Sequence, residues 1–369
     1  MKIVQILPEL NEGGVERGTM ELSRELVNRG FESVVISNGG KLAEQIKHDG
    51  GLHVTLDVCS KNPLSAPWRI FKLYQTLKKL SPDILHVRSR VPAWMSFFAN
   101  TFLHIPFVTT VHGLNSVSPY SKIMTKGDYI ICVSEIVRDY ILKHYHPDAK
   151  KITVIQRGVD LAQFDPEKID KTFIETFKTQ FSLHHKFIIT SVGRITWLKD
   201  YETFIEAIAI ARKTYPDIVG VIVGGIREDK NNYSQSLIDL ALQFGVAEHI
   251  IFTGSQSKMP EIYALSDVVV NASLKMGNVA RTVTEALAME TPVIATTYEG
   301  LNNVIVDDVN GYIIKTKDPE DLAEKIIRSY QQSFVNIRKN LNTEFTLDCL
   351  VSSTIGVYTK LIQQKKGLS

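Results

Sequence analysis

The sequence predicts an α/β protein built from two doubly wound domains, each with a largely parallel sheet. Strand-length apolar runs alternate with helix-length amphipathic segments, which is the pattern of parallel strands joined by helical crossovers. The series stops at a polar segment, residues 166–183, and then begins again. With 369 residues, 44% of them hydrophobic, the chain can bury two cores of roughly 150 residues each.

We expect a first domain over residues 1–165, a second over 166–345, and a C-terminal helix over 346–369 that packs back on the first domain. Because ligands of doubly wound sheets bind outside the carboxyl ends of the strands, we expect the ligand in a crevice between the domains. The strands expected in the first domain are 3–7, 33–37, 53–58, 84–87, 107–111 and 129–133, with 152–155 as a candidate seventh. Those of the second domain are 187–192, 218–223, 249–252, 267–270 and 293–295.

The formal net charge of +2 argues against a general polyanion-binding protein, and no nucleic-acid partner is expected. The charge is uneven, since residues 61–90 contain seven Lys and Arg residues and one acidic residue, Asp83. Together with aromatic residues nearby, this basic segment suits the phosphorylated headgroups of an anionic membrane. Because the aromatic residues recur at helical spacing, we expect several of them to belong to the core instead. They are Trp68, Phe71, Trp94, Phe97 and Phe98.

The three cysteines, Cys59, Cys132 and Cys349, are far apart, which disfavours a disulfide framework or a zinc site and favours a reducing compartment. The first apolar run is too short for a signal peptide, and no stretch of about 20 uninterrupted apolar residues exists. We therefore expect a cytoplasmic protein, with peripheral contact at the inner face of the cytoplasmic membrane as the alternative to free solution.

Residues 271–296 contain the loop that most resembles a ligand site. Small residues follow an apolar strand, and a helix is expected to start near Thr282. The free N–H groups at such a helix start, with the positive end of its dipole, suit a phosphate. Glu285 is expected in the first turn, where it either accepts hydrogen bonds from ribose hydroxyls or caps its own helix.

Gly13 and Gly14 directly follow the first expected strand and precede the first helix, so their backbone can approach a ligand closely. The order G-x-G-x-x-G is absent, and a purely steric reason for the glycines is the alternative. His112 ends the fifth strand at the same edge, where an imidazole can donate to a substrate or carry a proton. Its alternative is a structural histidine bonded to a neighbouring loop.

Arg194 and Lys199 follow the first strand of the second domain and are five residues apart. They can converge on a diphosphate, although an ordinary solvated pair is the alternative. After the next strand, Gly224 and Gly225 leave room for a base or ribose to lie against the backbone.

These motifs together resemble glycosyltransferase family 4, the retaining nucleotide-sugar enzymes of GT-B fold, in which two Rossmann-like domains face a central cleft. The resemblance covers the chain from Met1 to about Leu350 and rests on GGVE after the first strand, VHG after the fifth, VGR followed by a Lys, and EALAMETPVIAT. The segments SKNPL, TKGDYIICVSE and QRGVDLAQFDP further resemble a bacterial lipopolysaccharide core group that includes mannosyltransferases.

The resemblance implies that Arg194 and Lys199 hold the donor diphosphate, that Glu285 binds the ribose, and that His112 contacts the donor sugar near the reacting carbon. Other positions would line the phosphate and sugar. One position departs from the family, because Gly277 stands where a glutamate usually binds hydroxyls of the transferred sugar. The expected lining residues are Gly13, Gly14, Gly225, Asn278, Val279, Ala280, Arg281 and Thr282.

The implied activity is retaining, metal-independent transfer of a hexose from GDP-mannose or a UDP-sugar to a glycolipid or lipopolysaccharide core acceptor. The chain has no D-x-D sequence to hold a divalent ion, so fixed cations and helix N–H groups would stabilise the leaving group. Two alternatives stay open, namely a non-catalytic nucleotide-sugar-binding protein, suggested by Gly277, and a nucleotide-sugar epimerase of the same fold.

Overall fold

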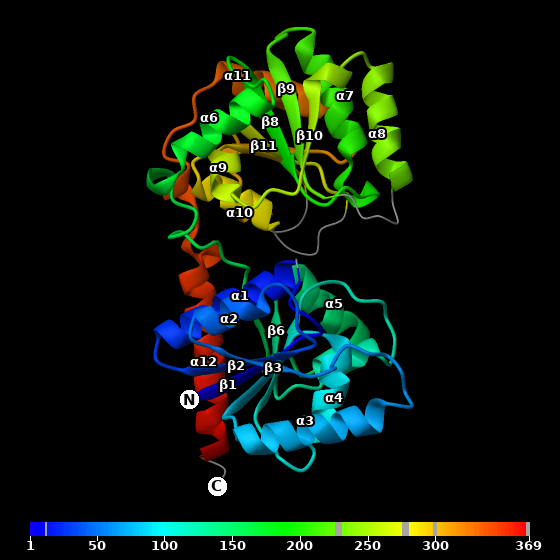
Figure 1. The fold of residues 1–369 in the computed structure, drawn as a ribbon, viewed down its shortest axis with the longest axis vertical. Helices are drawn as coiled ribbons and strands as arrows, with labels where there is room; N and C mark the ends of the chain where they lie inside the picture. Colours follow the sequence, from blue (N-terminus) through cyan, green and yellow to red (C-terminus); the bar gives the residue numbers. More distant parts are fainter. Residues whose placement is uncertain (12, 226–230, 275–279, 298–300, 367–369) are drawn as a thin grey trace. The chain divides into compact units, whose positions relative to one another are not determined.

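The computed structural model describes residues 1–11, 13–225, 231–274, 280–297 and 301–366, which form two compact units (Figure 1). The first unit consists of residues 1–157 and 347–369, and the second of residues 158–346. The chain therefore passes from the first unit to the second between Arg157 and Gly158. The boundary expected from the sequence was eight residues later, at residue 165.

Within the described residues, the first unit contains a seven-stranded parallel sheet in the order β3-β2-β1-β4-β5-β6-β7. Growth of the sheet reverses between β1 and β4, so the switch point lies at the carboxyl ends of these two strands. The strands are β1 (Lys2–Ile6), β2 (Glu32–Ser37), β3 (Leu52–Thr55), β4 (Ile84–Val87), β5 (Phe107–Val111), β6 (Tyr129–Cys132) and β7 (Ile152–Val154).

The helices of the first unit have apolar faces that pack on this sheet, as the sequence pattern indicates. Local signals set their ends: the Ser134 hydroxyl accepts the N–H of Val137 at the start of α5, and Ser81 adopts a left-handed conformation at the end of α3. The α-helices before the linker are α1 (Gly14–Asn28), α2 (Ala43–His48), α3 (Ala66–Leu80), α4 (Arg90–Asn100) and α5 (Glu135–Tyr145).

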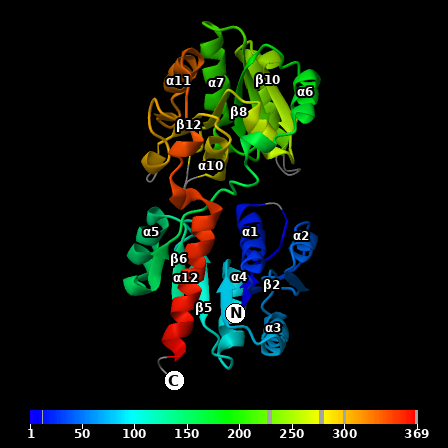
Figure 2. The same cartoon turned by 90° about the vertical axis from the view of Figure 1, so that its left-hand side faces the viewer.

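The C-terminal helix α12 (Leu347–Lys366) lies along the first unit, as Figure 2 shows. Its buried residues Val351 and Leu361 join a cluster with Ile3 and Leu22. Buried hydrogen bonds between side chains also join α12 to the sheet. His86 on β4 lies 2.6 Å from the Tyr358 hydroxyl through Nδ1 and 2.6 Å from Thr110 Oγ1 through Nε2. Burial holds the pKa of His86 well below its usual range, so the ring is neutral.

Within its described residues, the second unit contains a six-stranded parallel sheet in the order β10-β9-β8-β11-β12-β13, with a switch point between β8 and β11. The strands are β8 (Phe187–Val192), β9 (Ile218–Val223), β10 (Ile250–Gly254), β11 (Val268–Asn271), β12 (Val293–Thr296) and β13 (Gly311–Ile314). The α-helices are α6 (Lys171–Gln180), α7 (Tyr201–Arg212), α8 (Asn231–Gln243), α9 (Met259–Ala264), α10 (Arg281–Ala288) and α11 (Pro319–Gln331).

The edge strand β13 was not expected from the sequence. It has only four residues, and its first, Gly311, has φ 155° and lies so close to β12 that an added Cβ would stand 1.9 Å from the Val293 carbonyl oxygen. A short run that opens on glycine gives little strand signal, although here the glycine is what allows the pairing.

The sequence disfavoured a disulfide framework, and the three cysteines are free thiols. Among the described residues, no helix is both long enough and apolar enough to cross a lipid bilayer.

We predict that Tyr358→Phe destabilises the protein by about 1–3 kcal/mol, because it leaves Nδ1 of the buried His86 without its partner. Differential scanning calorimetry should show a melting temperature lower by a few degrees. Tyr215→Phe is the matched control, since the Tyr215 hydroxyl accepts from Nε2 of Gln331 at an exposed position. Equal melting temperatures for the two variants would contradict the anchoring role of Tyr358.

Candidate active site

In the second unit, two cations follow β8 on the loop that leads to α7. Arg194 is exposed, and Lys199 is half-buried at the end of a short 3-10 turn, Trp197–Lys199. Nζ of Lys199 donates to Oγ of Ser273, which follows β11, at 3.3 Å. Burial, and then the charge of nearby Arg194, lowers the pKa of Lys199. The two cations predicted to act together are thus neighbours at the β8–β11 switch point.

The glycines of this edge make room for their neighbours. An added Cβ on Gly224 would lie 1.9 Å from the Gly193 carbonyl oxygen, and one on Gly193 would lie 2.6 Å from Cε of Lys199. For Gly225 the nearest atom would be Oγ of Ser255, at 2.7 Å. Close packing of the protein on itself therefore accounts for these glycines, and the sequence interpretation of room for a ligand stays a prediction.

Glu285 is a buried carboxylate held by two side chains. Its Oε1 accepts from Nε of Arg281 at 3.1 Å, and its Oε2 accepts from the Tyr263 hydroxyl at 2.9 Å. The side chain of Glu285 is only 8% exposed. Each carboxylate oxygen keeps a second lone pair, so the group can still accept hydrogen bonds from a pair of ligand hydroxyls.

The expectation that Glu285 lies in the first turn of its helix is wrong. The helix α10 begins at Arg281 and has no acidic residue in its first turn. It starts one residue before the expected Thr282, which moves Glu285 into the second turn. The alternative that Glu285 caps its own helix fails for the same reason, because a cap must reach the N–H groups of the first turn.

A hydrogen bond ties the start of α10 to β11. Nδ2 of Asn271, the last residue of β11, donates to Oγ1 of Thr282 at 2.9 Å. Ala280 occupies the position before the helix. The expected lining residues Asn278 and Val279, and the unusual Gly277, lie outside the described residues.

In the first unit, Gly13 and Gly14 follow β1 and begin α1, and His112 directly follows β5. Nδ1 of His112 lies 3.5 Å from Nη2 of Arg157, and Nε2 of His112 is buried with no hydrogen-bond partner among the described residues. Burial, followed by the charge of Arg157, holds the pKa of His112 well below its usual range. The ring is therefore neutral at pH 7 and offers one N–H donor.

The structure adds residues to the candidate site that the sequence did not single out. Tyr263 comes from α9 and reaches Glu285, and Arg157 follows β7 and reaches His112. The sequence pattern around Tyr263 and Arg157 does not reveal these contacts, because each joins residues that are far apart in the sequence. Arg157 does belong to the segment QRGVDLAQFDP. That segment carried part of the family resemblance but gave no role to Arg157.

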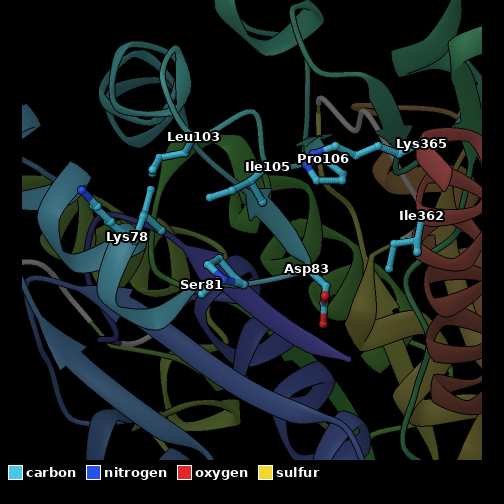
Figure 3. A pocket seen from close by; sticks show the side chains of 10 residues that line it. Lys78, Ser81, Asp83, Leu103, Ile105, Pro106, Ile362 and Lys365 are labelled. Atoms are coloured by element: carbon cyan, nitrogen blue, oxygen red, sulfur yellow. The ribbon is translucent and has the colours of Figure 1, made fainter. Parts of the chain in front are cut away.

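Figure 3 shows a cavity of about 490 Å³ in the first unit that lies away from these residues. It is lined by Asp83 and Pro106, which precede β4 and β5, and by Ile362 and Lys365 of α12. The cavity therefore opens at the amino ends of the strands, opposite the edge that carries His112. Ligand sites of doubly wound sheets lie at the carboxyl ends, so this cavity is not part of the candidate site.

Two family models match the chain, one described as Glycosyltransferase Family 4 over residues 12–163 and one as Glycosyl transferases group 1 over residues 173–344. The chain belongs to glycosyltransferase family 4. It is accordingly a transferase enzyme, and its two parallel-sheet units are the Rossmann-like domains of the GT-B fold.

Individual relatives agree with this assignment. A glycosyltransferase from Rickettsia africae has a crystal structure that matches 98% of this chain and 98% of its own, with a TM-score of 0.88 and 28% identity. The UDP-Gal:α-D-GlcNAc-diphosphoundecaprenol α-1,3-galactosyltransferase of Escherichia coli is 26% identical over 90% of this chain and 88% of its own. Anabaena HepE in complex with UDP-glucose shares the fold, with a TM-score of 0.80 and 19% identity over 96% of this chain and 99% of its own.

We predict that Arg194→Met and Lys199→Met each weaken nucleoside diphosphate binding about tenfold or more. A charge-assisted hydrogen bond to phosphate is worth roughly 1.5–3 kcal/mol, and 1.4 kcal/mol corresponds to a factor of ten. Isothermal titration calorimetry with GDP and UDP measures the effect.

The matched control is Lys213→Met, which removes an exposed lysine beyond the end of α7 and should leave both affinities unchanged. Unaltered affinity in both the Arg194 and the Lys199 variant would remove this pair from the donor site.

Proposed function

We propose that the protein is a retaining, metal-independent glycosyltransferase that moves a hexose from a nucleoside-diphosphate sugar to a glycolipid or lipopolysaccharide core acceptor. GDP-mannose and the UDP-sugars are the candidate donors. The observation that carries the proposal is that the second unit contains both two adjacent cations after β8 and the buried, side-chain-bonded carboxylate of Glu285.

The donor chemistry follows from these groups. Arg194 and Lys199 supply fixed positive charge for the diphosphate, whose negative charge grows as the glycosidic bond to the sugar breaks. The free N–H groups at the start of α10 add to it. Glu285 accepts hydrogen bonds from the two ribose hydroxyls, and Arg281 and Tyr263 keep its carboxylate oriented while it does so.

The acceptor side of the reaction needs no carboxylate nucleophile. In a retaining transfer of this kind, the acceptor hydroxyl attacks from the face that the diphosphate leaves, and the departing phosphate oxygen takes its proton. Neutral His112 can donate its N–H to a hydroxyl of the transferred sugar. Because the chain has no D-x-D sequence, the fixed cations take the place of a divalent ion at the diphosphate.

We predict that the purified protein transfers sugar from one donor of a panel to truncated lipopolysaccharide cores, with EDTA present. The panel is GDP-mannose, UDP-glucose, UDP-galactose and ADP-glucose, and the linkage is read by NMR. Retention appears as the same anomeric configuration in donor and product. Glu285→Gln should lower kcat/KM about tenfold or more because a charged acceptor is lost, whereas Glu290→Gln, at the exposed end of α10, should not.

The same experiment distinguishes the alternatives. Tight donor binding without transfer or hydrolysis would favour a non-catalytic binding protein, which is the alternative that Gly277 suggests. Recovery of an isomerised donor in the absence of acceptor would favour an epimerase. Loss of transfer with EDTA, restored by a divalent ion, would contradict metal independence.

We further propose that the first unit contacts an anionic membrane through the outer faces of α3 and α4. The expectation that several aromatic residues of this region belong to the core is wrong for four of them, because they project outward. Trp68 is 60% exposed, Phe71 47%, Phe97 38% and Phe98 48%. Figure 1 shows α3 and α4 side by side, and Phe102, which follows α4, is 79% exposed as well.

The charges around these exposed rings support the same partner. Residues 58–127 contain nine Lys and Arg residues and one acidic residue, Asp83. Nζ of Lys72 lies 5.1 Å from the ring centre of Trp68. An apolar cavity of about 310 Å³ opens beside Phe98, which lines it together with Ile70 of α3 and Trp94 of α4. Cations beside exposed rings suit a headgroup layer, and the cavity suits a hydrocarbon chain.

We predict salt-sensitive sedimentation of the protein with liposomes that contain phosphatidylglycerol, and little with neutral phosphatidylcholine. The double variant Trp68→Ser, Phe98→Ser should reduce the bound fraction several-fold, because two exposed rings are lost. Leu242→Ser is the matched control, since Leu242 is 61% exposed on α8 of the second unit. Equal binding to both liposome types at low salt would count against this surface.

A further inference from the structure

The cavity of about 310 Å³ between α3 and α4 is formed by segments that leave the carboxyl ends of strands. Residues 60–63 and the start of α3 follow β3, α4 follows β4, and Tyr120 lies in the segment that follows β5. His112 is the first residue of that last segment. The cavity therefore belongs to the side of the sheet on which doubly wound folds bind ligands, unlike the cavity of Figure 3.

The side chains that line this cavity are mostly apolar, and its buried arginine is bonded within the protein. Arg69 is 6% exposed. Its Nε donates to Oγ of Ser65 at 3.1 Å, its Nη2 donates to the Asn62 carbonyl oxygen at 3.0 Å, and its Nη1 lies 3.4 Å from Sδ of Met95. A carboxylate oxygen of Asp57 lies 3.8 Å from Nε and balances the charge. The apolar lining residues are Ala66, Ile70, Val91, Trp94, Met95 and Phe98.

The polar group of Trp94 is also bonded within the protein. Its indole N–H donates to the Tyr120 carbonyl oxygen at 3.0 Å. The Trp94 ring stacks on Phe98, with the ring centres 5.8 Å apart. Phe98 is 48% exposed, so part of this apolar wall faces water. An apolar ligand that displaces this water would be stabilised by the hydrophobic effect.

Cations stand beside the apolar wall. Lys61 is exposed and lines the cavity. The guanidinium of Arg90, one residue before Val91, lies 5.4 Å from the ring centre of Tyr120. None of the described residues that line the cavity is acidic. The arrangement suits a ligand with an apolar chain and a polar or phosphorylated head.

We propose that this cavity binds the hydrocarbon chain of the acceptor, which is then a saccharide linked to a lipid close to the reacting sugar. This assignment rests on the proposed function for the existence of an acceptor. It goes beyond membrane contact, because the bound chain belongs to the substrate. The side of the sheet that the cavity shares with His112 favours the substrate over a membrane lipid as its source. Ala66 and Ile70 thereby determine which acceptors bind.

The binding test uses the full chain without any membrane. The probes are n-hexyl, n-octyl and n-decyl β-D-glucoside, each below its critical micelle concentration, and methyl β-D-glucoside is the control without a chain. Isothermal titration calorimetry should show affinity rising roughly tenfold with each added pair of methylene groups until the cavity is full, because burial of apolar surface is favourable. Equal affinity for the methyl and octyl glucosides would overturn the proposal.

Two variants change the cavity wall in different ways. Ala66→Leu fills space and Ile70→Gln adds a polar amide, both at partly exposed positions of α3. Each should weaken octyl glucoside binding about tenfold and leave the melting temperature and the nucleotide affinity nearly unchanged. Ile238→Gln is the matched control, since Ile238 is 40% exposed on α8 of the second unit. Wild-type octyl glucoside affinity in both wall variants would overturn the proposal.

A further variant separates the cavity from the membrane-contacting faces of α3 and α4. Trp68 is 60% exposed and is not among the residues that line the cavity. Trp68→Ser should therefore reduce sedimentation with anionic liposomes and keep wild-type affinity for octyl glucoside. A tenfold loss of octyl glucoside affinity in this variant would place the chain on the outer faces of the helices and overturn the proposal.

The transfer test identifies the source of the chain. For one acceptor sugar with either an octyl or a methyl aglycone, wild type should have a KM at least tenfold lower for the octyl compound. Ala66→Leu should remove that difference and leave kcat and the KM for the donor unchanged. Equal KM values for the two compounds in wild type would assign the cavity to membrane lipid and overturn the proposal. If no donor is turned over, the proposed function fails, while the chain-length series still decides whether the cavity takes a hydrocarbon chain.

Discussion

The constraint on which both halves of this protein depend is that each sheet is wholly parallel and reverses its direction of growth once. In a parallel sheet the strands are covered by helices, so polar side chains that are to meet a ligand lie at the strand ends. The reversal leaves a gap at the carboxyl edge, between β1 and β4 in one unit and between β8 and β11 in the other. Arg88 follows β4 at the first of these places, and Lys199 meets Ser273 at the second.

Buried polar groups near the two switch points differ in whether they have hydrogen-bond partners. In the second unit, the carboxylate of Glu285 is matched by Arg281 and Tyr263, so its orientation is set before any ligand arrives. In the first unit, Arg88 and His112 keep buried nitrogens that no described residue bonds. A matched carboxylate suits hydroxyl groups, which need an oriented acceptor.

Much of the fold followed from the sequence because parallel strands buried on both faces are plain apolar runs. The strands of the first unit and five of the second lie where those runs predict. The exception, β13, is short and begins with a glycine that packing against Val293 requires. Helical spacing misled the assignment of Trp68 and Phe98, since periodicity places residues on one face of a helix without saying which face meets the core.

The candidate site was only partly predictable, for a physical reason that its glycines make clear. Gly14 suggested close approach of a ligand, but an added Cβ there would first meet Arg157, and an added Cβ on Gly193 would likewise meet Lys199. A long cationic side chain that must lie across a loop needs the volume that a Cβ would fill. Sequence spacing reveals the glycine and the cation separately, and only the folded chain shows that one makes room for the other. The glycines of these turns therefore make room for the cations that lie across them.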